Sequence, residues 1–205
     1  MSDHGMPHTT RWQALLSERL SVNEASRLLA RAQARYDLVE RQTPELPPGL
    51  DRTQWRRRVL PALAVYEVLQ EEGWGTDAAL ARVERLLWST FDRERRIMGL
   101  LRRLPRRATW LFFRALMRGQ LRWFYTTGTW QWAREGDRRV LAFDVTRCAI
   151  HEILTKRGAP ELTSVFCAMD DRLAALLPAS IRWRRTGTLA DGKDCCDFRY
   201  ERKGP

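Results

Sequence analysis

The sequence contains no long hydrophobic run. Its 205 residues include no stretch of about 18 uncharged apolar residues, the length that a membrane-spanning helix requires. The N-terminal segment, MSDHGMPHTTRWQALL, has no apolar run of signal-peptide length either. We therefore expect a cytoplasmic protein without a transmembrane segment.

Cysteine is scarce and unevenly placed. The four cysteines, at positions 148, 167, 195 and 196, lack the spacing of a secreted disulfide framework, so we expect free thiols in a reducing compartment. The apolar fraction of 44% and the nine tryptophans provide ample surface to bury, which excludes a disordered chain.

Lysine occurs at only three positions, so arginine carries nearly all of the positive charge behind the net +11, a bias typical of bacteria with GC-rich genomes. Residues 95–122 hold nine arginines and no acidic residue. Such a stretch can contact nucleic acid, an anionic membrane or an acidic partner. No nucleic-acid recognition motif accompanies it, so no specific nucleic acid is expected. We expect a solvated arginine face outside any substrate pocket, with a homo-oligomer or an acidic protein partner as alternatives.

The first half of the chain has helical patterns. Residues 21–42 begin with an S-x-x-E capping box and continue with apolar residues at helical spacing. Further helices are expected over 52–72 and 76–91, and Pro105 separates two more. In the second of these, the arginines at 114, 118 and 122 fall on one stripe, away from the aromatic side.

The second half has strand patterns. Within 130–147 we expect two strands joined by a turn at Glu135-Gly136-Asp137, and within 181–202 a hairpin that turns at Asp191-Gly192. Helices are expected between these two hairpins. The fold class is therefore α+β: a helical N-terminal region packed on a C-terminal antiparallel sheet with two intervening helices. The expected division is a flexible N-terminus over 1–20, a helical region over 21–125, and the sheet with its helices over 126–205.

Two helices of the second half carry cysteines close to other reactive groups. Cys167 and Asp170 form a C-x-x-D pair one helical turn apart, so both side chains can point the same way. Cys148 and His151 form a C-x-x-H pair at the start of a helix. A thiol beside an acid or a base can belong to a nucleophilic site or to a metal site.

Strand alternation sorts the other candidates. Cys196 shares its face with Phe198 and Tyr200, whereas Cys195 and Asp197 face the other way. Asp144 lies on the opposite face from Leu141, Phe143 and Val145, which makes it a lone acid there. Arg184 and Thr186 are expected on one face of the strand that begins at 181.

These residues also have structural explanations. Cysteine is among the most often buried residues and commonly acts as a small core side chain. Asp170 and Asp171 can be acids of the first turn of a helix, where the helix dipole favours them. From the residues alone, a nucleophilic site, a metal site and plain packing all remain open.

Four short motifs together resemble the L-2-amino-thiazoline-4-carboxylic acid hydrolase family. They are F-D-V-T-x-C at 143–148, F-C-x-x-D-D at 166–171, R-T-x-T-L at 185–189 after an L-P pair, and G-x-x-x-C-D-F at 192–198. Their order and spacing are more specific than any one of them, and the resemblance covers about Trp130 to Tyr200. The N-terminal half resembles the family only as a generic helical region.

The resemblance implies a hydrolase that acts on a carbon–nitrogen bond in a cyclic amidine. Water adds to the C=N carbon of a 2-amino-thiazoline ring, and an N-carbamoyl product results. A thiolate can attack such a carbon if a cation or a helix N-terminus lowers its pKa. Cys167 is the favoured nucleophile, ahead of Cys196 and Cys148.

The same resemblance suggests roles for the polar residues. A carboxylate, Asp170 or Asp144, would take a proton from water or protonate the leaving nitrogen. Arg184 would hold the carboxylate of a small-molecule substrate with two hydrogen bonds. Thr186, Asp171 and His151 complete the expected substrate-binding residues.

Two other interpretations remain open. Cys148, His151, Cys167 and Cys196 have soft-ligand chemistry suited to Zn²⁺, so a metal-dependent enzyme is an alternative, with Asp170 moving protons. The favoured mechanism requires no cofactor. A non-catalytic binding or accessory protein that uses its arginine-rich surface is the other alternative. For both the nucleophilic and the metal-dependent interpretation, we expect the thiols of Cys148, Cys167 and Cys196 to lie within about 10 Å of one another, because one small substrate or one metal must reach them.

Overall fold

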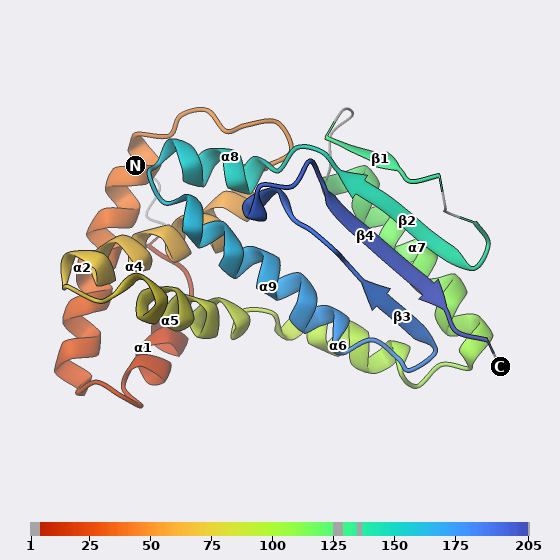
Figure 1. Cartoon of the computed structure of the whole chain (residues 1–205). Helices are drawn as coiled ribbons and strands as arrows, with labels where there is room; N and C mark the ends of the chain where they lie inside the picture. The colour runs from red at the N-terminus through yellow and green to blue at the C-terminus, as the bar shows by residue number, and fades with distance from the viewer. Residues whose placement is uncertain (1–4, 125–128, 135–136, 205) are drawn as a thin grey trace.

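Helices form the first part of the chain and an antiparallel sheet forms the last part, which confirms the α+β class (Figure 1). The computed structural model describes residues 5–124, 129–134 and 137–204, with the backbone alone at 122–124. The helices before the sheet are α1 (Thr9–Leu16), α2 (Val22–Arg41), α3 (Arg52–Gln54), a π-helical turn (Trp55–Val59), α4 (Leu60–Glu71), α5 (Thr76–Trp88), α6 (Asp92–Leu101) and α7 (Arg106–Phe124). The later elements are β1 (Trp130–Trp132), β2 (Val140–Val145), α8 (Ala149–Lys156), a 3-10 turn (Pro160–Leu162), α9 (Thr163–Ala174), β3 (Ile181–Arg184), a 3-10 turn (Leu189–Asp191) and β4 (Cys196–Arg202).

Helix α2 begins where the capping box predicts. The Ser21 hydroxyl accepts a hydrogen bond from the Glu24 backbone N–H at 3.2 Å, and the Glu24 carboxylate accepts one from the Ser21 N–H at 2.8 Å. These bonds occupy N–H groups that would otherwise lack a partner within the helix.

The N-terminal segment differs from the flexible stretch expected over 1–20. Residues 9–16 form α1, and Trp12 and Leu16 are fully buried against the other helices. Because Pro61 has no backbone N–H, it cannot donate the usual helical hydrogen bond to the Arg57 carbonyl. His8 Nε2 lies 3.2 Å from that carbonyl oxygen. The sequence does not predict that this segment packs on the other helices, because its buried residues are isolated and form no periodic pattern.

The sheet is antiparallel throughout, in the order β1-β2-β4-β3. In the β2–β4 pair, Val145 lies opposite Cys196 and Phe143 opposite Phe198. The expected turn residues Glu135 and Gly136 lie outside the described part of the chain. The expected hairpin near the C-terminus is present as β3 and β4, with Gly192 in the left-handed conformation at φ 74°.

Strand β3 is shorter than expected, because it ends at Arg184. The carboxylate of Asp197 accepts hydrogen bonds at 2.8 Å from the backbone N–H groups of Thr186 and Gly187, where a longer strand would pair with β4. Thr186 therefore does not share a strand face with Arg184, contrary to the alternation assumed from the sequence.

The described residues form two hydrophobic cores. The first joins helices α1, α2, α4 and α5 with α8 and α9, and the second joins the sheet with α6 and α7. Figure 1 shows the first group of helices at one side, the sheet and α7 at the other, and α9 between them. The helices inserted in the C-terminal half thus complete the N-terminal core, so the two halves of the sequence are not separate in space.

The arginine-rich stretch forms α6, α7 and the turn between them. Arg118 is exposed, and Arg114 lies over the ring of Trp110 at 5.8 Å. The side chain of Arg122 lies outside the described residues. Within the described part of the chain, no helix is long and apolar enough to cross a membrane.

Candidate active site

A cavity of about 310 Å³ is lined by residues of both hydrophobic cores. Helix α9 contributes Phe166, Cys167 and Asp170 to the lining, and the inner face of α7 contributes Phe113 and Met117. Strands β2 and β4, helix α6 and the π-helical turn complete the walls. Although α7 belongs to the arginine-rich stretch, none of its described arginines lines the cavity.

Three of the four cysteines line this cavity, from three different elements. Cys148 is the N-cap residue of α8, and its sulfur accepts the His151 backbone N–H at 3.5 Å. Cys167 lies in the middle of α9. Cys196 begins β4, and its sulfur accepts the Leu189 N–H at 3.3 Å. The neighbouring Cys195 is not among the lining residues.

The cavity thiols are protonated at neutral pH. Burial, followed by the nearby Asp170 carboxylate, raises the pKa of Cys167 to about 12. Burial also raises the pKa of Cys196, to about 11, and that of Cys148. The Arg185 guanidinium opposes the shift at Cys167 without reversing it. None of these sulfurs is a resting thiolate, so a nucleophilic role needs a base or a cation that arrives with the substrate.

Asp170 lies one turn from Cys167 on the same helix and lines the same cavity. Burial raises its pKa to about 6, against the opposing effect of Arg185, and the Asp171 carboxylate adds to the rise. A carboxyl group with a pKa near 6 can both accept and donate a proton at neutral pH. The position of Asp170 in the second half of α9 also overturns the structural explanation that these acids belong to a first helical turn.

Arg185 holds the acidic pair in place. Its guanidinium lies 3.2 Å from an Asp170 oxygen and 2.9 Å from an Asp171 oxygen, and it donates to the Cys167 carbonyl at 3.1 Å. Only 6% of its side-chain surface is exposed. Arg185, the residue after β3, therefore connects the end of this strand to the helix that carries Cys167 and Asp170.

Sequence reasoning missed Arg185 and chose its neighbour. Arg184 is exposed on β3 and does not line the cavity. The choice rested on an alternation that continued through Thr186, whereas the strand ends at Arg184. The R-T-x-T-L motif, which begins at Arg185, contained the correct signal.

Four other expected site residues do not line the cavity. Asp144 faces the other side of the sheet, where its carboxylate pairs with Arg199 at 2.7 Å, so it is not a lone acid. Thr186 donates its hydroxyl to Asp197 at 2.7 Å. His151 Nδ1 lies 3.2 Å from the Thr163 hydroxyl and links α8 to α9. Asp171 pairs with Arg185 but keeps 57% of its side-chain surface exposed.

The expected ligand set for zinc does not assemble. Among the described residues, no group of three or more His, Cys, Asp or Glu side chains is arranged to hold a metal ion. Cys148, Cys167 and Cys196 line one cavity, but His151 is absent from its lining.

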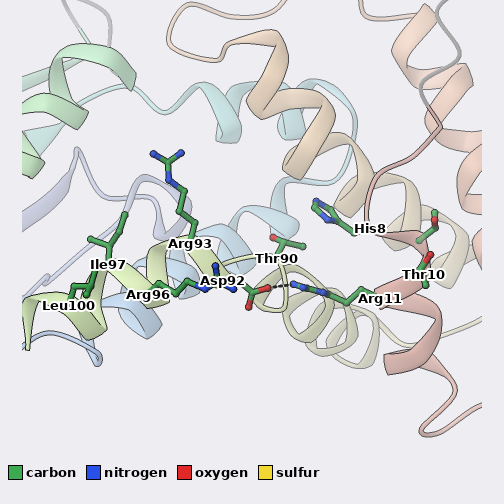
Figure 2. A pocket seen from close by; sticks show the side chains of 10 residues that line it. His8, Thr10, Arg11, Thr90, Asp92, Arg93, Arg96, Ile97 and Leu100 are labelled. Atoms are coloured by element: carbon green, nitrogen blue, oxygen red, sulfur yellow. Dashed lines mark ion pairs between the residues drawn. The ribbon is translucent and has the colours of Figure 1, made fainter.

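A second hollow of about 840 Å³ lies on the surface between α1 and α6 (Figure 2). Figure 2 shows the Arg11 guanidinium of α1 reaching the Asp92 carboxylate of α6, at 2.6 Å. Hydrogen bonds from Arg95 and Arg11 lower the pKa of Asp92, which makes it a poor proton acceptor. This hollow contains no cysteine, so the cavity that three cysteines line is the better candidate for thiol chemistry.

The fold and the cavity define an α+β protein with three thiols, one carboxyl group of raised pKa and a buried arginine around one cavity. In comparison with known families, residues 52–200 match the L-2-amino-thiazoline-4-carboxylic acid hydrolase family. The chain belongs to this family, whose name indicates a hydrolase of the thiazoline carboxylic acid. Comparisons with curated proteins and with solved structures give no match.

Proposed function

We propose that the protein opens a cyclic 2-amino-thiazoline ring by hydrolysis, with Cys167 as nucleophile and Asp170 as acid and base. One observation carries the proposal: Cys167 and Asp170 lie one turn apart on α9 and line the same cavity. Within that cavity, their proximity supports transfer of a proton from the thiol to the carboxylate.

The raised pKa of Cys167 indicates when the thiol becomes reactive. In the free protein, the pKa of about 12 keeps the sulfur protonated. A protonated 2-amino-thiazoline is an amidinium cation, and a cation beside the sulfur stabilises the thiolate. The substrate thus supplies the positive charge that the free site lacks, and Asp170, with a pKa of about 6, takes the proton.

The chemical steps balance around the ring carbon C2. The Cys167 sulfur forms a bond to C2 while the C=N electron pair moves to the ring nitrogen, which is or becomes protonated. The ring C–S bond then breaks, and the departing sulfur receives the proton held by Asp170. Asp170 next removes a proton from water, whose oxygen attacks C2. Collapse to the carbonyl expels the Cys167 thiolate, which regains a proton from Asp170, while the hydroxyl proton leaves to solvent. An N-carbamoyl thiol remains, with one water consumed in total.

Arg185 has a positioning role in this scheme. It contacts both carboxylates and the Cys167 backbone, so it fixes Asp170 relative to the thiol on α9. Because the guanidinium is already occupied, this role replaces the substrate-carboxylate contact expected of Arg184.

Turnover by Cys167 variants tests the proposal. With 2-amino-2-thiazoline-4-carboxylate at high concentration, Cys167→Ser and Cys167→Ala should abolish formation of the free thiol product, while circular dichroism shows an unchanged fold. Cys195→Ser is the matched control, because Cys195 lies outside the cavity lining. Near-normal turnover by Cys167→Ser would remove the thiol from the mechanism and leave Asp170 activating water directly.

A further inference from the structure

Five charged side chains line the cavity within the described part of the chain. They are the arginines at 58, 147 and 185 and the acids Glu94 and Asp170. When all five are ionised, the lining carries a net charge of about +1. This balance favours an anionic group in the substrate, and a thiazoline-4-carboxylate carries one.

Two of the three lining arginines are each held by more than one acceptor. Arg185 contacts Asp170, Asp171 and the Cys167 carbonyl, as described above. Arg147 donates from Nε to one Glu152 oxygen at 2.5 Å and from Nη2 to the other at 2.9 Å, so these two side chains form a bidentate pair. Moving either arginine to a ligand would leave an acid without its cation.

Arg58 is held less completely. Its guanidinium donates one hydrogen bond, from Nη2 to Glu94 Oε1 at 2.5 Å, and its remaining N–H groups have no acceptor among the described residues. The other Glu94 oxygen is buried and also has no partner among them. The guanidinium carbon lies 4.1 Å from the centroid of the Phe91 ring. The acid and the ring therefore fix the direction of Arg58 while donors remain for a ligand.

One guanidinium can bind two carboxylates, and this chain contains an example. Arg185 contacts both Asp170 and Asp171. Arg58 contacts a single acid and has 30% of its side-chain surface exposed, whereas Arg185 has 6% exposed. A substrate carboxylate can therefore bind Arg58 as a second acid without displacing Glu94.

Arg58 also lies on a different wall of the cavity from the favoured nucleophile. It belongs to the π-helical turn, a feature frequent at functional sites, whereas Cys167 belongs to α9. In a 2-amino-thiazoline-4-carboxylate, the carboxylate on C4 points away from C2. The arginine that binds it must lie across the ring from the sulfur that attacks C2. Arg185 does not meet this condition, because it is bonded to the Cys167 carbonyl.

We infer that Arg58 binds the carboxylate of the substrate, while Glu94 and Phe91 hold its guanidinium in position. The ring lies between Arg58 and Cys167, with C2 toward the sulfur. This inference rests on the proposed function for the identity of the ring. It assigns to Arg58 the contact that sequence reasoning expected of Arg184.

Two compounds that share the ring and differ in the carboxylate test the inference. They are 2-amino-2-thiazoline-4-carboxylate and 2-amino-2-thiazoline, and calorimetry on the Cys167→Ala protein measures their binding without turnover. We expect Arg58→Met to weaken binding of the carboxylate compound at least about tenfold, because a charge-assisted hydrogen bond is lost. Arg58→Met should not weaken binding of the unsubstituted ring.

Two further variants separate a direct contact from general charge and from misfolding. Arg147→Met removes the same charge from the lining and should weaken carboxylate binding by less than about threefold, because only a screened long-range attraction is lost. Arg58→Lys keeps a cation for Glu94 but lacks the planar fork for a second acid, so carboxylate binding should fall by at least about threefold. Thermal unfolding confirms that each variant is folded.

Glu94→Gln should have an effect of the opposite sign. This variant removes the acid that competes with the ligand for Arg58, so the carboxylate compound should bind about threefold more tightly. A bridge between Arg58 and Glu94 with a purely structural role predicts no such gain.

The outcomes separate this inference from the proposed function. Unchanged carboxylate binding by folded Arg58→Met, or by Arg58→Lys where Arg58→Met does not fold, would overturn the inference and leave the Cys167 reaction standing. Equal losses for both compounds, or equal losses in Arg58→Met and Arg147→Met, would also overturn it. Arg58-dependent binding of the carboxylate compound without turnover by the wild-type protein would support the inference and contradict the proposed reaction.

Discussion

The two sides of strand β4 adjoin the same kinds of side chain but differ in their chemistry. On the inner face, Cys196 lines a cavity that it shares with Asp170 and Arg185. On the outer side, Cys195 lies near Asp144, Asp197 and Arg199. Each face therefore brings a thiol, carboxylate and arginine together, within a few residues of the same strand.

Burial and hydrogen bonding shift the pKa values of the acids on the two sides in opposite directions. Hydrogen bonds from Thr186 and Gly187 outweigh the effect of burial and lower the pKa of Asp197, which therefore organises the loop after β3. On the inner face, burial raises the pKa of Asp170 to about 6. Proximity of thiol and acid is thus insufficient to define a site; the surrounding protein determines which acid can exchange a proton near neutral pH.

The largest expected difference is in kcat/KM, between a variant that replaces an acid on one side of β4 and a variant that replaces an acid on the other side. Asp170→Asn should lower kcat/KM by at least about 100-fold, because general acid–base catalysis contributes about 10²–10⁴-fold. Asp144→Asn should stay within about tenfold of the wild type, since Asp144 pairs with Arg199 outside the cavity. Steady-state kinetics of the two variants, with thermal unfolding as a check of folding, provides the measurement. Equal losses in both would contradict the assignment of Asp170.

The pH dependence should follow the same acid. Asp170 acts first as a base and must be ionised, so kcat/KM should fall as the pH decreases through about 6, the pKa of this group. Stability should depend on pH in the opposite direction to activity. A carboxyl group with a raised pKa stabilises the fold most at low pH, and this contribution is lost as the pH rises through about 6. Asp170→Asn should therefore unfold no earlier than the wild type at pH 8. A flat activity profile from pH 5 to 8 would exclude Asp170 as the base.

The two neighbouring arginines should differ in their effect on stability. Arg185→Ala removes the cation that Asp170 and Asp171 share, and we expect a loss of about 1–2 kcal/mol, less than the usual cost of breaking a buried pair because both acids are partly exposed. Arg184→Ala should change the free energy of unfolding by less than about 0.5 kcal/mol. Denaturant titration measures both. A larger loss from Arg184→Ala would mean that the assignment of the two arginines is reversed.

The smallest expected difference between the two sides of β4 is the rate at which iodoacetamide alkylates each cysteine, and this rate can be assigned to individual residues. Cys195 is the least enclosed thiol, so iodoacetamide should modify it before Cys167 and Cys196, whose pKa values are raised to about 12 and 11. Peptide mass spectrometry over a time course gives the order. Faster modification of Cys167 in the free protein would show that its thiolate does not depend on the substrate.

Local patterns predicted the elements of the fold. The S-x-x-E box marks the start of α2, and alternation places Leu141, Phe143 and Val145 on the inner face of β2. It also separates Cys195 from Cys196. These features depend on neighbours in sequence, where spacing alone determines which side chains share a face.

Features that depend on distant residues were not predicted. Strand β3 ends at Arg184 because Asp197, eleven residues beyond Thr186, takes the next backbone N–H groups. Helix α1 docks through single anchors such as Trp12. The motifs of the sequence indicated the elements that carry the candidate site, but the raised pKa of Asp170 comes from packing around α9, which no local pattern contains.

The central claim is that Cys167 forms a covalent bond to the ring carbon of the substrate, and trapping that bond tests it most directly. Wild-type protein is mixed with 2-amino-2-thiazoline-4-carboxylate, quenched in acid within the first turnover, and analysed by intact-protein and peptide mass spectrometry. Ring opening keeps the released sulfur attached to the same fragment, so we predict an adduct on Cys167 with the full mass of the substrate. Turnover at an undiminished rate by Cys167→Ser, with no adduct on any cysteine of the wild type, would contradict the account.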